Sequence, residues 1–158
     1  MALTVEDGSV VTGADAYEDA ATTAARLAAL NLSSFDGKTE AEQEKIIRRR
    51  TIECEEQLRA GVEGTETSDG QPRLFPRLRC YDTQMRLFDS DDIPEALKAA
   101  VAHRCEDDAA GRVSTGRRDV KSHSSARGKI EYTGNGAGVF ASQSPEAQQH
   151  LRRLFWNL

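Results

Sequence analysis

The clearest pattern in the chain is a stripe of apolar residues that recurs every four positions between residues 91 and 111. Such spacing is typical of a helix with one buried face. Asp91 or Asp92 can accept hydrogen bonds from the first free N–H groups, and Pro94 suits the first turn. Gly111 offers the left-handed stop that often follows a helix. We therefore predict the central helix of a bundle, with a stripe made of Ile93, Leu97, Val101 and Cys105.

Three further stretches are predicted to be helical. Residues 14–32 carry Ala and Leu at helical spacing. Thr39 and Glu42 form a capping-box pattern, which starts a second helix that runs to about Ala60. Ser144 and Pro145 mark the start of a last helix. The inward positions of these last two helices are Ile46, Ile47, Cys54 and Leu58, and then Ala147, Leu151, Leu154, Phe155 and Leu158.

A short strand pattern follows Gly111. Residues 127–133 alternate polar and apolar side chains, and Val120 with Ile130 and Tyr132 can form a two-stranded ribbon that turns around residues 124–128. An isolated hairpin is marginal in water, so we expect something outside the chain to stabilise it. Residues 134–138 contain three glycines without the strand and helix that a dinucleotide loop requires, which indicates a hinge.

These elements predict a mainly α fold. It is a small helical bundle with a β-hairpin excursion and an extended C-terminal arm that ends in a short helix. Residues 1–111 form the predicted core, and residues 112–158 form the arm. At 158 residues, with 38% hydrophobic residues, one domain is expected. The chain has no long apolar run, so we expect no transmembrane span. It does not begin with a charged segment followed by an apolar one, so we expect no secretory signal.

An irregular stretch at residues 73–81 interleaves basic and aromatic residues. Pro76 opposes a helix there and favours an extended Phe75. We expect the stretch to be pinned to the bundle by Leu74, Phe75 and Leu78. We expect four residues of the stretch to line a groove or to contact a neighbouring subunit. They are Arg73, Phe75, Arg77 and Arg79.

The net charge of −5 conceals an asymmetry along the chain. Residues 1–36 have one Arg and six acids, whereas residues 113–158 have seven Lys or Arg and three acids. A chain with unlike charges at its ends can stack head to tail or face two different partners. An ordinary solvated surface explains the same charges, and both interpretations stay open.

The sequence has no recognisable active-site pattern. The three cysteines, Cys54, Cys80 and Cys105, lack metal-ligand spacing and are odd in number, which opposes a zinc site and a disulfide framework and favours folding under reducing conditions. The three histidines lie on separate elements, and the chain has no catalytic or phosphate-loop motif. We predict a protein that is not an enzyme and that uses no cofactor or metal.

Two charged or apolar segments allow two interpretations each. Arg48, Arg49 and Arg50 can bind phosphate, but Glu–Arg pairs three or four residues apart explain them better. The apolar C-terminus either packs on the chain's own core or inserts into a partner. Its candidate docking residues are Leu151, Leu154, Phe155, Trp156 and Leu158.

Several short motifs, taken in order, resemble the head–tail adaptor (head-completion) proteins of tailed phages, some of which are described as DnaT-like single-stranded-DNA-binding proteins. They cover most of the chain, but each is short and degenerate. Residues 46–50 and 62–69 depart from the family pattern, which leaves the subunit contacts open. The motifs are Ala14-Asp15-Ala16-Tyr17, Gln71 with Phe75-Pro76-Arg77, residues 93–100, Val120-Lys121-Ser122, residues 128–132 and the closing Leu-rich helix.

The resemblance implies a structural protein of the virion neck, made in the host cytoplasm. It would form a ring of about twelve copies below the portal, join capsid to tail, and surround the channel through which DNA leaves. Its expected partners are further copies, the portal, and a tail nozzle or a stopper (tail-completion) protein, with DNA only passing through and no membrane. The hairpin residues expected to contact neighbours or line the channel are Lys121, Arg127, Lys129, Ile130 and Tyr132.

The alternative function is a single-stranded-DNA-binding accessory protein of replication. Such proteins combine a basic groove with aromatic residues that stack on bases. Aromatic residues make up 6% of this chain, and only residues 73–81 interleave Arg with Phe and Tyr. The sequence therefore favours the adaptor, and oligonucleotide binding discriminates between the two.

Overall fold

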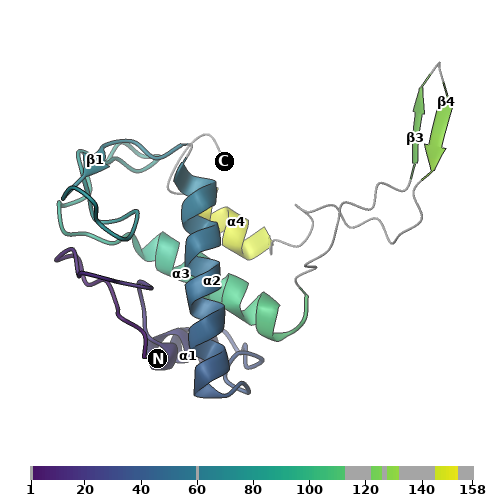
Figure 1. Cartoon of the computed structure of the whole chain (residues 1–158), viewed down its shortest axis with the longest axis horizontal. Coiled ribbons are helices and arrows are strands. Elements are labelled where there is room, and N and C mark those ends of the chain that lie inside the picture. Colours follow the sequence, from purple (N-terminus) through teal and green to yellow (C-terminus); the bar gives the residue numbers. More distant parts are fainter. Residues whose placement is uncertain (1, 60, 113–121, 126–127, 132–144, 153–158) are drawn as a thin grey trace.

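The computed structural model describes residues 2–59, 61–112, 122–125, 128–131 and 145–152. Four helices account for most of the regular structure, which confirms the predicted mainly α fold with a small antiparallel hairpin (Figure 1). The helices are α1 (Ala20–Ala28), α2 (Glu40–Arg59), α3 (Glu95–Ala109) and α4 (Pro145–Arg152). The strands are β1 (Thr65–Glu66), β2 (Arg77–Leu78), β3 (Ser122–Ser125) and β4 (Gly128–Glu131).

Helix α3 is the central helix, because α1, α2 and α4 all pack against it. The four residues of its predicted stripe are buried, from Ile93 at 6% exposure to Leu97 and Cys105 at 0%. At its end, Arg112 N donates to Asp107 O and Gly111 N donates to Asp108 O. Gly111 has a φ of +69°, so this is the predicted glycine stop in the form of a Schellman motif.

The predicted start of α3 is wrong in one respect. Pro94 occupies the N-cap position, and no side chain caps the helix there. Asp92 instead donates its backbone N–H to the Asp89 carbonyl in a separate turn. The helix therefore begins one turn after the aspartates, with Glu95 as the acidic residue of its first turn.

Helix α1 is shorter than predicted, because the chain before it is extended. Asp19 caps the helix by accepting a hydrogen bond from Thr22 N. Upstream, Val5 and Ala16 form an isolated parallel bridge, so the N-terminal lead-in docks along residues 14–17. Ala16 and its neighbour Tyr17 are buried at 0% and 3% exposure in this extended segment. Alanine content alone thus misplaced the helix start by six residues.

The capping box of α2 is confirmed. The Glu42 carboxylate accepts from Thr39 N at 3.0 Å and from Thr39 Oγ1 at 2.7 Å. The inward residues of α2 join a core that also holds Phe35, the predicted anchor after α1, at 0% exposure. All three cysteines are free and buried. None of the described helices is long and apolar enough to cross a membrane.

Residues 61–92 form a lobe with little regular structure, called the loop lobe below. Its strands β1 and β2 pair antiparallel, with Thr65 opposite Leu78. Gly64 is required beside them, since its φ is +80° and a Cβ there would lie 2.3 Å from the Leu78 carbonyl oxygen. In Figure 1 the loop lobe lies to the left of α2.

Helix α4 extends the core beyond the predicted boundary at residue 111. It packs on α3, and both Ala147 and Leu151 are fully buried. His150 of α4 stacks on His103 of α3, with ring centroids 5.3 Å apart. The β3–β4 hairpin turns where predicted and pairs His123 with Ile130.

Candidate nucleic-acid interface

The arginine triplet on α2 is the first candidate for phosphate binding, and each of its members faces carboxylates. Arg48 lies 3.2 Å from Asp15 and 3.7 Å from Glu44. Arg49 and Arg50 both bind Asp108 of α3. The prediction of Glu–Arg pairs along the helix is confirmed for Glu44 and Glu53, but the contacts with Asp15 and Asp108 were missed.

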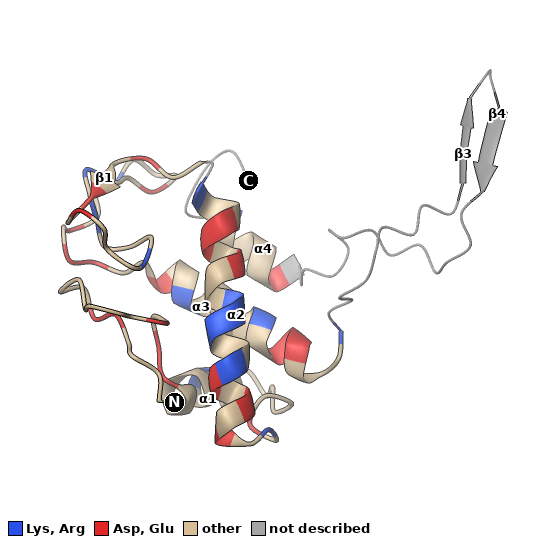
Figure 2. Cartoon of the chain, in the orientation of Figure 1, with Lys and Arg blue, Asp and Glu red and all other residues tan. Residues whose placement is uncertain are grey.

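Arg50 shows how completely these charges are used inside the chain. Its side chain is 5% exposed and lies between Glu53 and Asp108. Burial lowers the pKa of the guanidinium, but hydrogen bonds and charge attraction from Glu53 and Asp108 outweigh it and raise the pKa overall. Arg49 and Arg50 therefore tie α2 to α3. Figure 2 shows both blue and red turns on these two helices.

The stretch at residues 73–81 is the second candidate, and its core half is buried. Leu74 and Phe75 are 2% and 1% exposed, which confirms that they pin the stretch to the bundle. The prediction was wrong for Leu78, which is 38% exposed. Phe75, which was predicted for the groove or subunit contact, is buried within this chain, where its ring meets Phe88 edge-on.

A buried polar network fixes this stretch. Tyr17 donates its hydroxyl to Glu55 Oε1 at 2.6 Å, and Phe75 N donates to the Tyr17 hydroxyl at 3.0 Å. Leu74 N also donates to Glu55 Oε1. Burial, followed by the Glu55 charge, raises the pKa of Tyr17 well above its ordinary value, so the hydroxyl stays protonated. Arg73 completes the network at 3.6 Å from Glu55.

The other basic residues of the stretch differ in their availability. The Arg77 guanidinium donates to the carbonyls of Glu63 and Gly64, which closes the loop lobe around β1. Arg79 is exposed, and Tyr81 beside it is 37% exposed. Arg79 is therefore the residue of the predicted groove that is exposed, and Tyr81, which was not predicted for it, is also accessible to a ligand.

Among the described residues of the bundle, the exposed lysines and arginines do not line a common groove. Lys38, Lys45, Arg59 and Arg79 are exposed and form no ion pair with a described residue. Lys45 and Arg59 lie on α2 about 21 Å apart along the axis, at about 1.5 Å per residue. Such isolated charges cannot track a phosphate backbone.

A cleft at the N-terminal side of the bundle is acidic. It has a volume of about 400 Å³ between the N-terminal segment, α1 and the start of α3. Lys98 is the single cation among its lining residues, and the carboxylates that line it would repel DNA. The carboxylates that line it are Glu6, Asp7, Glu18, Asp19, Asp91 and Asp92.

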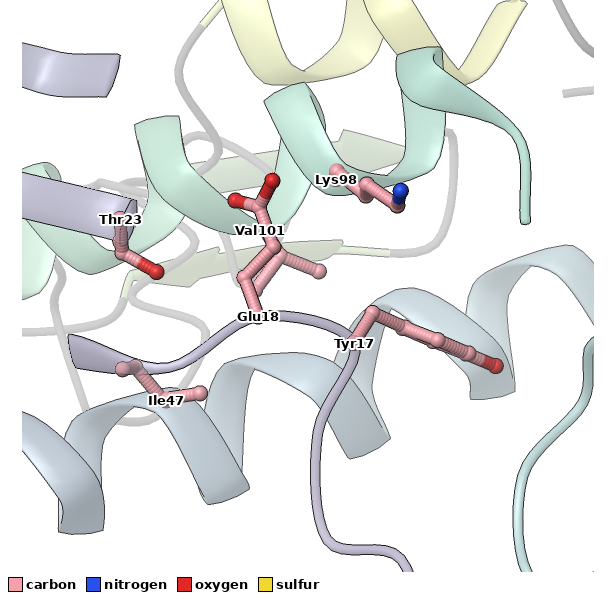
Figure 3. Close-up of a pocket in the computed structure, with 6 residues that line it drawn as sticks. All are labelled: Tyr17, Glu18, Thr23, Ile47, Lys98 and Val101. Carbon is pink, nitrogen blue, oxygen red and sulfur yellow. The ribbon is translucent and has the colours of Figure 1, made fainter. Parts of the chain in front are cut away.

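A narrower crevice continues between the helices beside the acidic cleft. Figure 3 shows that Tyr17 and Glu18 reach it from the N-terminal segment, while Ile47 comes from α2 and Val101 from α3. It has no room for a water molecule. It is a packing seam between helices, and it offers no place for a nucleotide.

The predicted arm residues are placed only in part. Lys129 and Ile130 lie on β4, opposite Ser124 and His123. The other predicted hairpin residues, Lys121, Arg127 and Tyr132, lie outside the described residues. In the tail, Leu151 is fully buried in the chain's own core, whereas Leu154, Phe155, Trp156 and Leu158 lie outside the described residues.

Sequence reasoning missed one exposed feature, the hairpin formed by residues 80–88. Asp82 accepts hydrogen bonds from the backbone of Gln84 and Arg86, and Met85 at the tip is 74% exposed. Asp82 at the first position of the turn was the available signal, because an Asp side chain there accepts a hydrogen bond from the backbone two residues on. Elsewhere among the described residues, no three His, Cys, Asp or Glu side chains are placed to hold a metal ion.

Comparison with known proteins gives one match. A family model described as "putative DnaT-like ssDNA binding protein" matches residues 1–157 of the chain. No curated protein and no solved structure matches it. The match covers the bundle, the loop lobe and the arm, so these parts form one family unit.

Proposed function

Because the chain belongs to the family described as "putative DnaT-like ssDNA binding protein", we propose that it binds single-stranded DNA. The family match over residues 1–157 is the observation that carries this proposal. It favours the function that the sequence ranked second. The adaptor function, which the sequence ranked first, receives no support from the comparisons.

Charge distribution supports the arm as the part that contacts DNA. Residues 1–112 have 14 Lys or Arg and 23 Asp or Glu, whereas residues 113–158 have seven and three. A polyanion is therefore repelled by the bundle and attracted by the arm. The arm carries the predicted basic residues Lys121, Arg127 and Lys129.

The expected binding is weak, independent of base sequence and sensitive to salt. Contacts from lysine and arginine to phosphate release counterions, so affinity falls steeply as salt rises. Tyr81 and Arg79 add one place where a base can stack. The cleft at the N-terminus takes no part, since its carboxylates oppose phosphate.

Fluorescence anisotropy of a labelled oligothymidylate at about 50 mM and about 200 mM salt tests the proposal. The variant Lys121→Gln/Arg127→Gln/Lys129→Gln should reduce the slope of log affinity against log salt by about 2, at about 0.7 per lost phosphate contact. The control Lys38→Gln/Lys45→Gln/Arg59→Gln removes equal charge from the bundle and should bind like the wild type. Absence of binding at the lower salt, or equal losses in both variants, would contradict the proposal.

A second candidate is the adaptor function, in which the chain assembles with copies of itself, the portal and a tail-completion protein in a virion. The observation that favours it is the pairing of the described arginines with carboxylates, as in Arg49 and Arg50 with Asp108. Arginines that are paired with carboxylates are not available to bind phosphate. This suits a protein that assembles around DNA better than one that binds it. Negative-stain micrographs of the protein mixed with a tailed-phage portal should then show added rings, and unchanged portal particles would contradict this candidate.

A further inference from the structure

The hairpin of residues 80–88 displays apolar side chains on a rigid support. Tyr81 and Leu87 form an antiparallel bridge, and Phe88 N donates to Cys80 O at 2.9 Å. Cys80 is fully buried, and the Phe88 ring meets Phe75 edge-on with centroids 6.5 Å apart. The base of the hairpin is therefore anchored in the core of the bundle.

The tip of the hairpin is held by a single carboxylate. Asp82 Oδ1 accepts from Gln84 N at 2.8 Å and from Arg86 N at 2.9 Å, while Oδ2 accepts from the Arg86 guanidinium at 2.8 Å. Met85 N donates to the Asp82 carbonyl. These bonds hold Met85 at a φ of +61°, a conformation that costs a non-glycine residue energy and is characteristic of functional loops.

This support exposes a patch of large apolar side chains. Six such side chains are exposed among the described residues, and four of them lie in this hairpin or at the end of β2, two residues before it. Single exposed apolar residues are ordinary, but several within one short segment, two of them paired across the hairpin as Tyr81 and Leu87 are, indicate an interaction site. The four are Leu78 at 38%, Tyr81 at 37%, Met85 at 74% and Leu87 at 59% exposure.

The chemistry of the patch favours a protein as its occupant. Met85 and Leu87 are aliphatic and cannot stack on bases as aromatic rings do. The Arg86 guanidinium forms an ion pair with Asp82, which reduces its capacity to bind phosphate. The surrounding loop lobe has four Lys or Arg and seven Asp or Glu, so an occupant with apolar and basic side chains fits it.

The chain itself carries a segment of that character. Residues 153–158 contain one arginine and four large apolar residues, Leu154, Phe155, Trp156 and Leu158. They follow α4, which packs on α3 and lies across α2 from the loop lobe in Figure 1. We propose that the hairpin of one copy binds residues 153–158 of a second copy.

This contact uses none of the basic residues of the arm named above, and Tyr81 is the one residue of the patch that also belongs to the proposed stacking place for DNA. The two side chains that the test replaces, Met85 and Leu87, are not among the residues proposed to contact DNA, so loss of association and loss of DNA binding can be told apart. The contact also links one copy to the next in a head-to-tail manner, since donor segment and acceptor hairpin occupy different places on the chain. The contact is therefore heterologous, and the same chain can donate to one neighbour and accept from another.

Sedimentation of the full-length protein over a range of concentrations, with Trp156 emission recorded on the same samples, tests the contact. Trp156 is the single tryptophan of the chain, so its emission reports on the proposed occupant. The wild type should gain mass with concentration while the emission shifts to shorter wavelength. Met85→Gln/Leu87→Gln should weaken this association at least about tenfold, because two apolar contacts are lost.

The matched control is Leu30→Gln/Ile52→Gln, which removes two apolar side chains exposed at 50% and 45% elsewhere on the bundle. It should associate like the wild type. The proposal is overturned if the wild type stays monomeric, if the control loses as much association as the hairpin variant, or if the emission is independent of concentration. The last result would show that residues 153–158 pack within their own copy.

Discussion

Three buried glutamates hold the irregular parts of this molecule in place. Each accepts hydrogen bonds from backbone N–H groups of a loop, which a single charged group can do for several donors at once. Glu6 accepts from Gly8, Val10 and Val11. Glu55 accepts from Leu74, and Glu106 accepts from Ser34 and Phe35. These contacts replace the regular pairing that the loops lack.

Glu106 makes a contribution to the stability of the fold that depends on pH. Burial raises the pKa of its carboxyl, but the hydrogen bonds from Ser34 and Phe35 and the charge of Arg112 outweigh burial and lower the pKa overall. A lowered pKa in the folded state stabilises the fold above the unfolded value of about 4.3. That contribution is lost as the pH falls through the folded pKa.

We therefore predict that Glu106→Gln lowers the free energy of unfolding at pH 7 by about 1–3 kcal/mol, since its backbone donors lose a charged acceptor. The difference from the wild type should shrink as the pH falls below about 4. Urea unfolding at several pH values measures both effects. Glu66→Gln, at an exposed position of β1, is the control and should change little. A loss of stability that is equal at all pH values would contradict the assignment.

At the scale of elements, local signals in the sequence predicted two helix ends correctly, and they failed where a contact between distant residues sets the structure. The Thr39–Glu42 box and the Gly111 stop involve bonds within a few residues, so they could be read directly. The start of α1 depends on Ala16 pairing with Val5, and no local propensity reveals that. Asp108 pairs with Arg50 across 58 positions, which made the arginine triplet ambiguous in the sequence.

Helix α4 illustrates the same limit, because its apolar face could have met either the core or a partner. Leu151 is fully buried in the core, so Leu151→Ala should lower the free energy of unfolding by about 2–5 kcal/mol. Thermal or urea unfolding followed by circular dichroism measures this. Gln149→Ala, on the exposed side of α4, should cost less than about 0.5 kcal/mol. Equal stability of Leu151→Ala and the wild type would show that α4 leaves the bundle in solution.

At the scale of the whole molecule, the fold class was predictable and the candidate site was predictable only in part. Helical periodicity and the alternating pattern around Ile130 are properties of neighbouring residues, and both led to the observed elements. Exposure is a property of the assembled chain. Phe75 and Met85 both lie in irregular apolar stretches, yet one is 1% and the other 74% exposed. Sequence spacing could not separate them.

The charge separation between bundle and arm leads to the last prediction. Residues 113–144 contain five Lys or Arg and two acids, whereas the core is built from residues before 113 and from α4. Replacing residues 113–144 by a Gly/Ser linker of equal length should therefore keep the unfolding free energy within about 1 kcal/mol, since β3 and β4 are the described elements that it removes and a two-stranded hairpin adds little stability.

The same replacement should abolish the binding of oligothymidylate at about 50 mM salt, because the bundle that is left repels phosphate. Circular dichroism and anisotropy on one preparation measure both properties. A chain that unfolds would show that the arm contributes to the core. A folded chain that still binds DNA would move the interface to the bundle, with Arg79 and Tyr81 as the first residues to replace. Retained fold with lost binding is the outcome that the separation of charge requires.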